Sequence, residues 1–318
     1  MPRALKSLLA VSLIVGLPLA PAALAQDYPS KPVELYVNYG AGGGTDLSFR
    51  AFGQLLQEAL GTPVAVVNKP GGGGVIGATA LAKAKPDGYT IGNMNLPALD
   101  ASFATDALPI DPRKAFVPLG IVMFDPAVVA VAANSRFKNI GDLVGHLKAN
   151  PSGATYAATG KVSTDGLTAL AIEKAGNVKF RIVSFDGGKE AITAALGGHV
   201  DVVGLTISEA LPYLKDGSLR LLGIGGDSRN PDAPDVPTFK EQGMPLNING
   251  SSRGFIMPVG APDAVVQKLR ETIKKVAESE AYAAKAKQMG LQPVYIAPDA
   301  VAKHMDSEIG WLQVNVPK

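Results

Sequence analysis

The chain has 318 residues, with 30 Lys and Arg against 28 Asp and Glu, 36 glycines and no cysteine. A net charge of +2 gives no strongly basic surface, so nucleic acid is not an expected partner. The lack of cysteine excludes disulfides and cysteine-linked lipid anchors. A chain of this length buries enough surface to fold without disulfides and is long enough for two domains.

The first 25 residues have the pattern of a secretory signal peptide. Arg3 and Lys6 precede an apolar run over residues 7–19, and Ala23 and Ala25 form an A-x-A cleavage motif. We therefore expect cleavage after Ala25 and export to the periplasm.

The rest of the chain alternates runs of β-branched residues with runs of helical periodicity. Strands are predicted over residues 33–37, 64–67, 89–91, 127–132, 154–158, 180–183 and 219–224. Helices are predicted over residues 46–60, 78–82, 140–149, 163–175, 189–196, 262–279, 280–289 and 298–312. This alternation predicts an α/β fold with mainly parallel sheets, in two halves separated by a cleft.

Two glycine-rich loops, residues 39–46 and 68–77, each lead from a predicted strand to a helix N-terminus. Glycines there let backbone N–H groups converge on an anion, and the helix N-terminus favours negative charge. Gly72, Gly74 and Gly77 also fit G-x-G-x-x-G, but the motif follows the second strand and no acidic strand end comes about 20 residues later. We therefore expect no dinucleotide cofactor.

The second half offers two further loops, residues 159–164 and 185–188, each at a predicted helix start. Ser163 and Thr164 are good N-caps, so simple capping is the alternative to ligand binding. If both loops face the cleft, they oppose the glycine loops and form a clamp for a small anion.

The sequence contains few candidate catalytic residues. G-x-S-x-G is absent, and His146, His199 and His304 show no metal-ligand spacing, so neither a metal nor a cofactor is expected. Asp46 has the position of a general base or, more simply, of a helix cap that fixes the first glycine loop.

Several motifs together resemble a known family, the Bug-type periplasmic substrate-binding receptors of tripartite tricarboxylate transporters. They are Tyr28-Pro29-Ser30-Lys31-Pro32-Val33, Gly42-Gly43-Gly44-Thr45-Asp46, Asn68-Lys69-Pro70-Gly71, Lys85-Pro86-Asp87-Gly88-Tyr89-Thr90, Leu196-Gly197-Gly198-His199-Val200-Asp201, Asp235-Val236-Pro237-Thr238 and Pro258-Val259-Gly260-Ala261-Pro262. The likeness covers nearly the whole chain after the signal peptide.

The resemblance implies a type II periplasmic binding protein fold, in which domain 2 is inserted in domain 1. Domain 1 is expected over residues 26–124 and 224–318 and domain 2 over residues 125–223, with crossover strands near residues 121–131 and 219–225. Such receptors close around a small carboxylate and deliver it to membrane permease subunits. A monomer is expected.

Carried onto this chain, the resemblance and the loops together give a set of candidate ligand-binding residues. They are Tyr39, Ala41, Gly42, Gly43, Gly44, Thr45, Asp46, Gly71, Gly72, Gly73, Gly74, Thr159, Lys161, Ser163, Thr164, Asp186, Gly187, Thr206 and Arg253. Arg253 lies where the return crossover strand is expected to begin. It is expected either to pair with a ligand carboxylate or to face solvent between the domains.

This chain departs from the family pattern where specificity is expected. Many members carry Phe-Asp where this chain has Gly204-Leu205, so a carboxylate is missing from the expected cleft floor. This difference favours a purely anionic or partly aromatic ligand over one with an amino group. Two alternatives to a transport receptor stay open: a periplasmic α/β hydrolase or esterase with Ser163 or Thr164 as nucleophile, and a sensory receptor coupled to a signalling protein.

Overall fold

The computed structural model describes residues 28–246 and 248–316. The signal peptide predicted over residues 1–25 lies outside these residues. The first part of the chain forms β1 Val33–Val37, α1 Gly44–Leu60, β2 Val64–Asn68, the short 3-10 helix η1 Gly72–Gly74, α2 Val75–Ala82, β3 Thr90–Leu96, α3 Ala98–Ala104 and α4 Pro112–Ala115. β1 lies between β2 and β3 and is parallel to both. The glycine loops that follow β1 and β2 therefore leave the same edge of the sheet.

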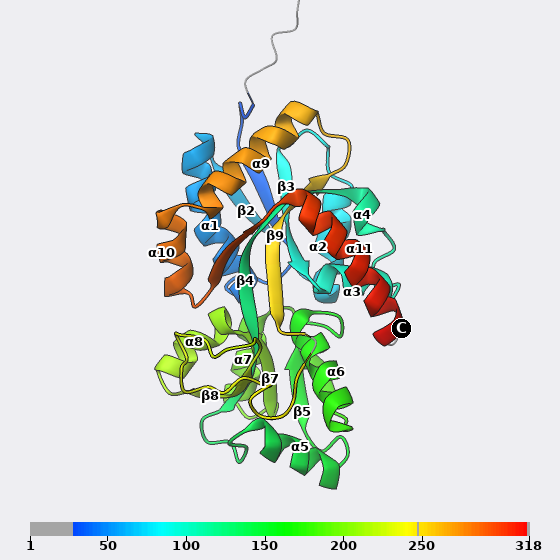
Figure 1. Ribbon diagram of the computed structural model, residues 1–318, viewed down its shortest axis with the longest axis vertical. Helices are drawn as coiled ribbons and strands as arrows, with labels where there is room; N and C mark the ends of the chain where they lie inside the picture. The colour runs from blue at the N-terminus through cyan, green and yellow to red at the C-terminus, as the bar shows by residue number, and fades with distance from the viewer. Residues whose placement is uncertain (1–27, 247, 317–318) are drawn as a thin grey trace, which may run out of the picture.

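The middle of the chain forms a second half with the same strand and helix alternation. Its elements are β4 Phe116–Ala132, α5 Ile140–Ala149, β5 Thr155–Ala158, α6 Thr164–Gly176, β6 Arg181–Ser184, α7 Gly188–Leu196, β7 Val202–Thr206, α8 Ile207–Lys215 and β8 Leu219–Ile224. β5 lies between β6 and β7 and is parallel to both. The chain then forms β9 Gly250–Pro258, α9 Asp263–Ala277, α10 Glu280–Gln288, β10 Gln292–Ile296 and α11 Pro298–Asn315, which lie with the first half, and α11 extends toward the second (Figure 1).

Two long strands, β4 and β9, run between the two halves (Figure 1). They pair antiparallel from Phe116 opposite Pro258 to Pro126 opposite Gly250. In the described residues ten strands form one sheet, in the order β2-β1-β3-β9-β4-β7-β5-β6, with β8 and β10 also paired to β4. The predicted first crossover coincides with β4. The second crossover was predicted at residues 219–225, but β8 pairs with the far end of β4 and stays in the second half, so β9 makes the return.

The first half is built around a core between the sheet and helices α1, α9 and α10. Phe52 on α1 lies with its ring centroid 5.0 Å from that of Phe255 on β9 and 4.8 Å from that of Tyr282 on α10. All three rings are fully buried, and burial of each contributes about 1.5–3 kcal/mol. These contacts bring residues from both ends of the chain into one domain core.

The second half has an apolar core on each face of its sheet. The connection between β8 and β9 belongs to these cores, because Val236, Phe239 and Leu246 are buried in them. The return to domain 1 was expected at residue 224. The burial of this connection favours a later return, at β9, and we propose that domain 2 extends to about residue 249.

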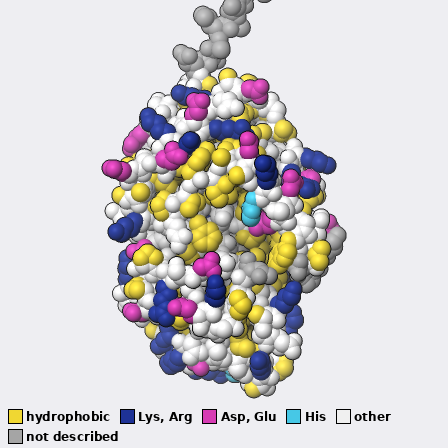
Figure 2. Space-filling model, viewed as in Figure 1, with side chains coloured by type: hydrophobic (Ala, Val, Ile, Leu, Met, Phe, Trp, Pro, Cys, Tyr) yellow, Lys and Arg dark blue, Asp and Glu magenta, His cyan; other side chains and the backbone are white. Residues whose placement is uncertain are grey.

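The surface carries both charged and hydrophobic side chains. On the face shown in Figure 2, acidic and basic side chains are intermixed and hydrophobic side chains gather toward the middle. Among the described residues, no helix has the length and apolar character needed to cross a membrane.

Candidate ligand-binding cleft

Loops from the two halves meet at the waist of the molecule. The Gly40 N–H, after β1, donates to the Asp186 carbonyl oxygen, after β6, at 3.3 Å. A Cβ built on Gly160, after β5, lies only 3.0 Å from the Cα of Gly73, after β2. The two halves therefore approach each other over the carboxyl ends of four parallel strands, where parallel α/β sheets bind ligands.

A polar cavity of about 30 Å³ lies between these loops. Nine predicted residues line it: Tyr39, Gly43, Gly44, Thr45, Thr159, Ser163, Thr164, Thr206 and Arg253. This volume holds no more than about two water molecules. A ligand of several carbon atoms therefore requires the halves to separate or the lining side chains to move.

The other ten predicted residues do not line this cavity: Ala41, Gly42, Asp46, Gly71, Gly72, Gly73, Gly74, Lys161, Asp186 and Gly187. Gly73 and Gly74 line an adjacent cavity of about 10 Å³ together with Tyr39 and Asn95. The side chains of Lys161 and Asp186 are exposed.

Asp46, in the first turn of α1, fixes the two glycine loops to each other. Its carboxylate accepts hydrogen bonds from the Gly42 N–H at 2.8 Å, from Asn68 Nδ2 at 2.8 Å and from Arg50 Nε at 2.9 Å. Burial alone raises the pKa of Asp46, but the bonds from Arg50, Gly42 and Asn68 outweigh it and hold the pKa below its ordinary value. Asp46 therefore positions the loops, but it does so from inside the first turn of α1, because the N-cap of this helix is Gly43 and not Asp46. Asp46 does not line the cavity.

Ser163 is the N-cap of α6. Its Oγ donates to the Gly160 carbonyl oxygen at 2.7 Å and accepts from the Gly166 N–H at 3.2 Å. The next acidic residue, Asp165, is buried and accepts from the Thr159 N–H at 2.6 Å and from Thr159 Oγ1 at 2.9 Å. Burial raises the pKa of Asp165. These bonds fix the loop that carries the cavity residues of the second half.

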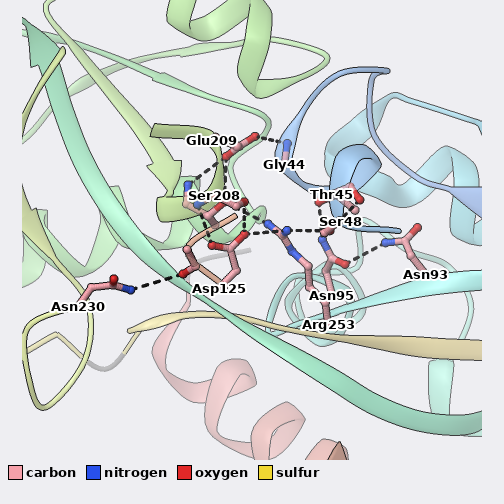
Figure 3. Close-up of polar contacts among 12 residues, drawn as sticks. Gly44, Thr45, Ser48, Asn93, Asn95, Asp125, Ser208, Glu209, Asn230 and Arg253 are labelled. Atoms are coloured by element: carbon pink, nitrogen blue, oxygen red, sulfur yellow. Dashed lines mark hydrogen bonds and ion pairs between the residues drawn. The ribbon is translucent and has the colours of Figure 1, made fainter. Parts of the chain in front are cut away.

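Arg253 on β9 is buried in the cleft wall rather than facing solvent. Its Nη1 lies 2.7 Å from a carboxylate oxygen of Asp125 on β4 and also donates to Ser48 Oγ at 3.2 Å. Nη2 donates to Thr206 Oγ1 at 3.1 Å, so Arg253 reaches residues of both halves (Figure 3). Ser208 supports the pair, since its Oγ donates to Asp125 at 2.5 Å. The guanidinium charge is thus already matched by a carboxylate of the chain itself.

Glu209, in the first turn of α8, connects the second half to the N-terminus of α1. Its Oε1 accepts from the Gly44 N–H at 3.0 Å (Figure 3), while its Oε2 accepts from the Thr206 N–H at 3.0 Å and from Thr206 Oγ1 at 3.1 Å. A Cβ on Gly44 would lie 2.5 Å from Glu209 Cγ, so only glycine allows this approach. Burial raises the pKa of Glu209, with a further contribution from Asp165, although Arg253 and the backbone donors act in the opposite direction.

A ladder of asparagines on β3 continues the polar network below the first loop. The Asn38 N–H donates to Asn93 Oδ1 at 2.8 Å, Asn93 Nδ2 donates to Asn95 Oδ1 at 2.9 Å, and Asn95 Nδ2 donates to Thr45 Oγ1 at 3.0 Å. All four residues are buried. The ladder sets the position of Thr45 at the cavity wall.

Gly188, in the predicted loop 185–188, and Leu205, at the expected cleft floor, also line the cavity. Four lining residues were missed by the sequence analysis: Asn95, Asp165, Glu209 and Ser251. Two of these residues, Asp165 and Glu209, change the charge expected for the cleft. The change to Gly204-Leu205 was expected to leave the cleft floor without a carboxylate, but Asp165 and Glu209 supply carboxylates from the N-termini of α6 and α8. Thr206-x-x-Glu209 fits the capping-box motif, which was the available signal for Glu209.

A polar cavity between two α/β halves, with paired strands joining the halves, is the architecture of a periplasmic solute-binding protein. The chain belongs to the tripartite tricarboxylate transporter receptor family TctC, whose model matches residues 48–311. The family resemblance seen in the sequence is thereby confirmed.

Relatives and solved structures agree with this assignment. The UPF0065 protein in the gbd 5' region of Cupriavidus necator is 33% identical over 290 residues, which are 90% of this chain and 87% of that protein. The structure of the periplasmic binding protein BugD matches with a TM-score of 0.85 and 27% identity, covering 90% of this chain and 97% of that one. MatC from Rhodopseudomonas palustris with bound malate matches with a TM-score of 0.86 and 26% identity, covering 91% and 100%.

The family consists of periplasmic solute-binding receptors, so the chain is a receptor and not an enzyme. The alternative of a hydrolase is set aside. Its suggested nucleophile Ser163 caps α6 and donates its hydroxyl proton to a backbone carbonyl. In residues 28–246 and 248–316, no group of His, Asp and Glu side chains is arranged to hold a metal ion.

Proposed function

We propose that this receptor captures a small organic carboxylate, mono- or dicarboxylate, between its two halves and delivers it to the membrane permease subunits of a tripartite tricarboxylate-type transporter. In this proposal the chain is exported to the periplasm, cleaved after Ala25, and acts as a monomer. The ligand is bound by the loops that meet at the waist, through backbone N–H groups and the hydroxyls of Thr45, Thr159 and Thr206.

The observation that carries the proposal is the convergence of helix N-termini on one cavity. Gly43 and Gly44 begin α1, Ser163 and Thr164 begin α6, and Gly188 begins α7, and all five residues line the cavity. Helix N-termini carry partial positive charge and N–H groups that have no partner within the helix, which favour an anion. At α1 a carboxylate already takes this place, because the Gly44 N–H donates to Glu209. The bound malate of the related MatC supports a carboxylate as that anion.

Capture by closure follows from the connections between the halves. In the described residues β4 and β9 join the two halves as a paired ribbon, and the loops at the waist close over a cavity too small for a carboxylate of several carbons. A rotation of one half against the other about β4 and β9 admits the ligand and then buries it.

The proposal is tested by thermal shift with residues 26–318, refolded to remove ligands acquired during expression. The panel holds citrate, C4–C6 dicarboxylates, nicotinate, benzoates, phthalates and amino acids. At about 100 times Kd a ligand adds roughly 2.7 kcal/mol, which for a chain of this size raises Tm by about 5–10 °C. A shift of this size with one class of carboxylate supports the proposal, and a folded protein that responds to no carboxylate contradicts it.

The partner needs its own experiment. Pull-down of membrane proteins with the liganded receptor is expected to recover permease subunits. Recovery of a signalling protein in their place would support the sensory alternative and overturn delivery to a permease.

A further inference from the structure

A second and larger cavity lies outside the cleft, between α6 of the second half and the C-terminal end of α11 from the first half. Its volume is about 920 Å³, and none of its described lining residues also lines the cleft cavity. Leu167 comes from α6, Leu246 from the connection before β9, and Trp311 from α11. Sites for small molecules have volumes of roughly 300–1,000 Å³ and often lie between domains. The cavity therefore has the size and the place of a ligand site.

The wall of this cavity is mainly apolar. The buried apolar residues of its described lining are Leu147, Leu167, Val178, Leu246 and Ile248. Trp311, the one tryptophan of the sequence, also lines the cavity and is 39% exposed. An aliphatic chain that enters the cavity leaves water and contacts these side chains, which is favourable. The body of the expected ligand is therefore apolar.

The charged side chains of the cavity are mostly basic. Among the described residues of its lining are three lysines, Lys148, Lys174 and Lys179, and one acidic residue, Glu173. Glu173 is buried, and its two oxygens accept from Lys179 Nζ and from the Phe180 N–H, each at 2.8 Å. Lys148 and Lys174 lie in the last turns of α5 and α6, but each helix end carries only about half a negative charge. The described lining therefore keeps a net positive charge, which favours an anionic group.

The cavity borders a contact between the two halves. Leu167 on α6, Ala101 on α3 and Leu312 on α11 are buried in one apolar cluster, and Val316 packs against it. Leu167 and Val316 also line the cavity. Figure 1 shows the end of α11 reaching from the first half toward α6. A molecule in the cavity therefore contacts both halves.

We propose that this cavity is a second binding site, separate from the cleft, for an amphiphilic monoanion: a long aliphatic chain that ends in a carboxylate, as in a fatty acid. The chain lies against Leu167, Leu246 and Trp311, and the carboxylate lies at the rim, near Lys148. A short dicarboxylate does not suit this site, because it has no long apolar body and would bring a second charge against the apolar wall. The site does not depend on which solute the cleft binds.

The test is a titration of residues 26–318 with dodecanoate below its micellar concentration. Because Trp311 is the only tryptophan, its emission reports on the cavity, and we expect a blue shift that saturates with one equivalent. Two ligand controls separate the head group from the chain. Butyrate keeps the carboxylate on a short chain, and dodecyltrimethylammonium keeps the chain with a positive head group. Each is expected to bind about tenfold or more weakly than dodecanoate.

Two variants change the cavity itself. Lys148→Glu reverses the charge at the rim, so it is expected to weaken dodecanoate about tenfold or more and to strengthen dodecyltrimethylammonium. Lys275→Glu is the matched control, because Lys275 is also exposed, also lies in the last turn of its helix, α9, and does not line the cavity. Ala171→Phe narrows the cavity without changing its charge and is expected to weaken dodecanoate as well. Thermal unfolding of each variant checks that it is folded.

The outcomes separate this site from the cleft. Dodecanoate binding that is unchanged in Lys148→Glu and Ala171→Phe, or that never saturates, overturns the second site. Equal binding of dodecyltrimethylammonium by the wild type overturns it too. Loss of dodecanoate binding in a folded Gly73→Val variant has the same consequence, because the amphiphile then occupies the cleft.

The proposed function is judged by different results. A cleft that binds no carboxylate of the thermal-shift panel contradicts the proposed function and leaves the second site standing. If Ala171→Phe does not fold, Lys148→Glu and the two ligand controls decide.

Discussion

Arg253 on β9 and Asp125 on β4 form a buried ion pair, 2.7 Å between Nη1 and a carboxylate oxygen, on the two strands that join the halves. Their side chains are 3% and 0% exposed. Replacing only one residue of a fully buried ion pair lowers the stability of the fold strongly, because the remaining buried charge is left without a partner.

We expect Arg253→Ala to lower the free energy of unfolding by about 3–5 kcal/mol. Urea unfolding followed by circular dichroism measures the change. The double variant Arg253→Met/Asp125→Leu removes both charges and is the control, and it is expected to lose clearly less stability than the two single changes combined. A loss below about 1 kcal/mol for Arg253→Ala would show that the pair is not desolvated in solution.

Gly73 has φ of +67°, a left-handed conformation that a β-branched residue adopts only with strain, and it contacts Gly160 and Val162 of the other half. We expect Gly73→Val to abolish ligand binding because it distorts the second glycine loop where the halves meet. Gly243→Val is the matched control, since Gly243 has φ of +73° and nothing within 4 Å of a built Cβ. Titration of both variants with the identified ligand is the measurement. Similar affinity in the two variants would show that the second glycine loop is not part of the ligand-binding site.

Asp46 connects the two glycine loops, and its pKa is held below the ordinary value mainly by Arg50, against the opposing effect of burial. An acid with a lowered pKa in the folded state stabilises the fold above the ordinary Asp pKa of about 3.9 and loses this contribution as the pH falls. We expect Asp46→Asn to weaken ligand binding, to lower stability at pH 7 by about 1–3 kcal/mol, and to flatten the loss of stability below pH 4.

The control for Asp46 is Asp227→Asn, because Asp227 forms a surface pair with Lys240 and is 91% exposed. Its stability is expected to change by less than about 0.5 kcal/mol. Denaturation curves from pH 3 to 7 test both variants, and parallel pH profiles for Asp46→Asn and the wild type would contradict the assigned role.

Asp100 on α3 is fully buried near Glu308 on α11, and neither Asp100 oxygen accepts a hydrogen bond from the described residues. Burial, followed by the charge of Glu308, raises the pKa of Asp100 well above its ordinary value. The folded state therefore binds a proton that the unfolded state releases, so stability falls as the pH rises above about 4.

We expect Asp100→Asn to remove that slope, so that the variant is more stable than the wild type at pH 8. Glu271→Gln, on the exposed side of α9, is the control and should keep the slope. Thermal unfolding between pH 5 and 8 is the measurement. A larger fall in stability with rising pH in Asp100→Asn than in the wild type would contradict the burial of a protonated carboxyl group.

The parts of the fold that could be predicted from the sequence are those with strong local patterns. Strand 33–37 and helix 140–149 have the predicted bounds because their apolar residues follow a strand or helix period without interruption. β9 has no strand pattern of its own, because Gly250–Pro258 mixes serine, arginine and glycine between two neighbouring strands. Only the start of a return strand near Arg253 was expected there. α8 was missed because it is short and contains Pro212.

The same distinction between local patterns and long-range contacts applies to the residues of the candidate site. The glycine loops and the serine and threonine caps were predicted because their residue types require a turn or a helix start. Glu209 was missed as a cavity residue because its local sequence motif indicates only a helix cap. Its contact with Gly44 spans 165 positions in the sequence and depends on how the two halves meet.

The pairing of β4 with β9 also bears on how this receptor is expected to change shape, because these strands join its two halves. Narrow, two-stranded parts of a sheet take a larger twist than its wide parts. Torsion of the β4–β9 ribbon moves the second half as a lever whose far end travels much farther than the cleft residues. We therefore expect a shift of less than one ångström at the cavity to produce a larger displacement at the outer loops.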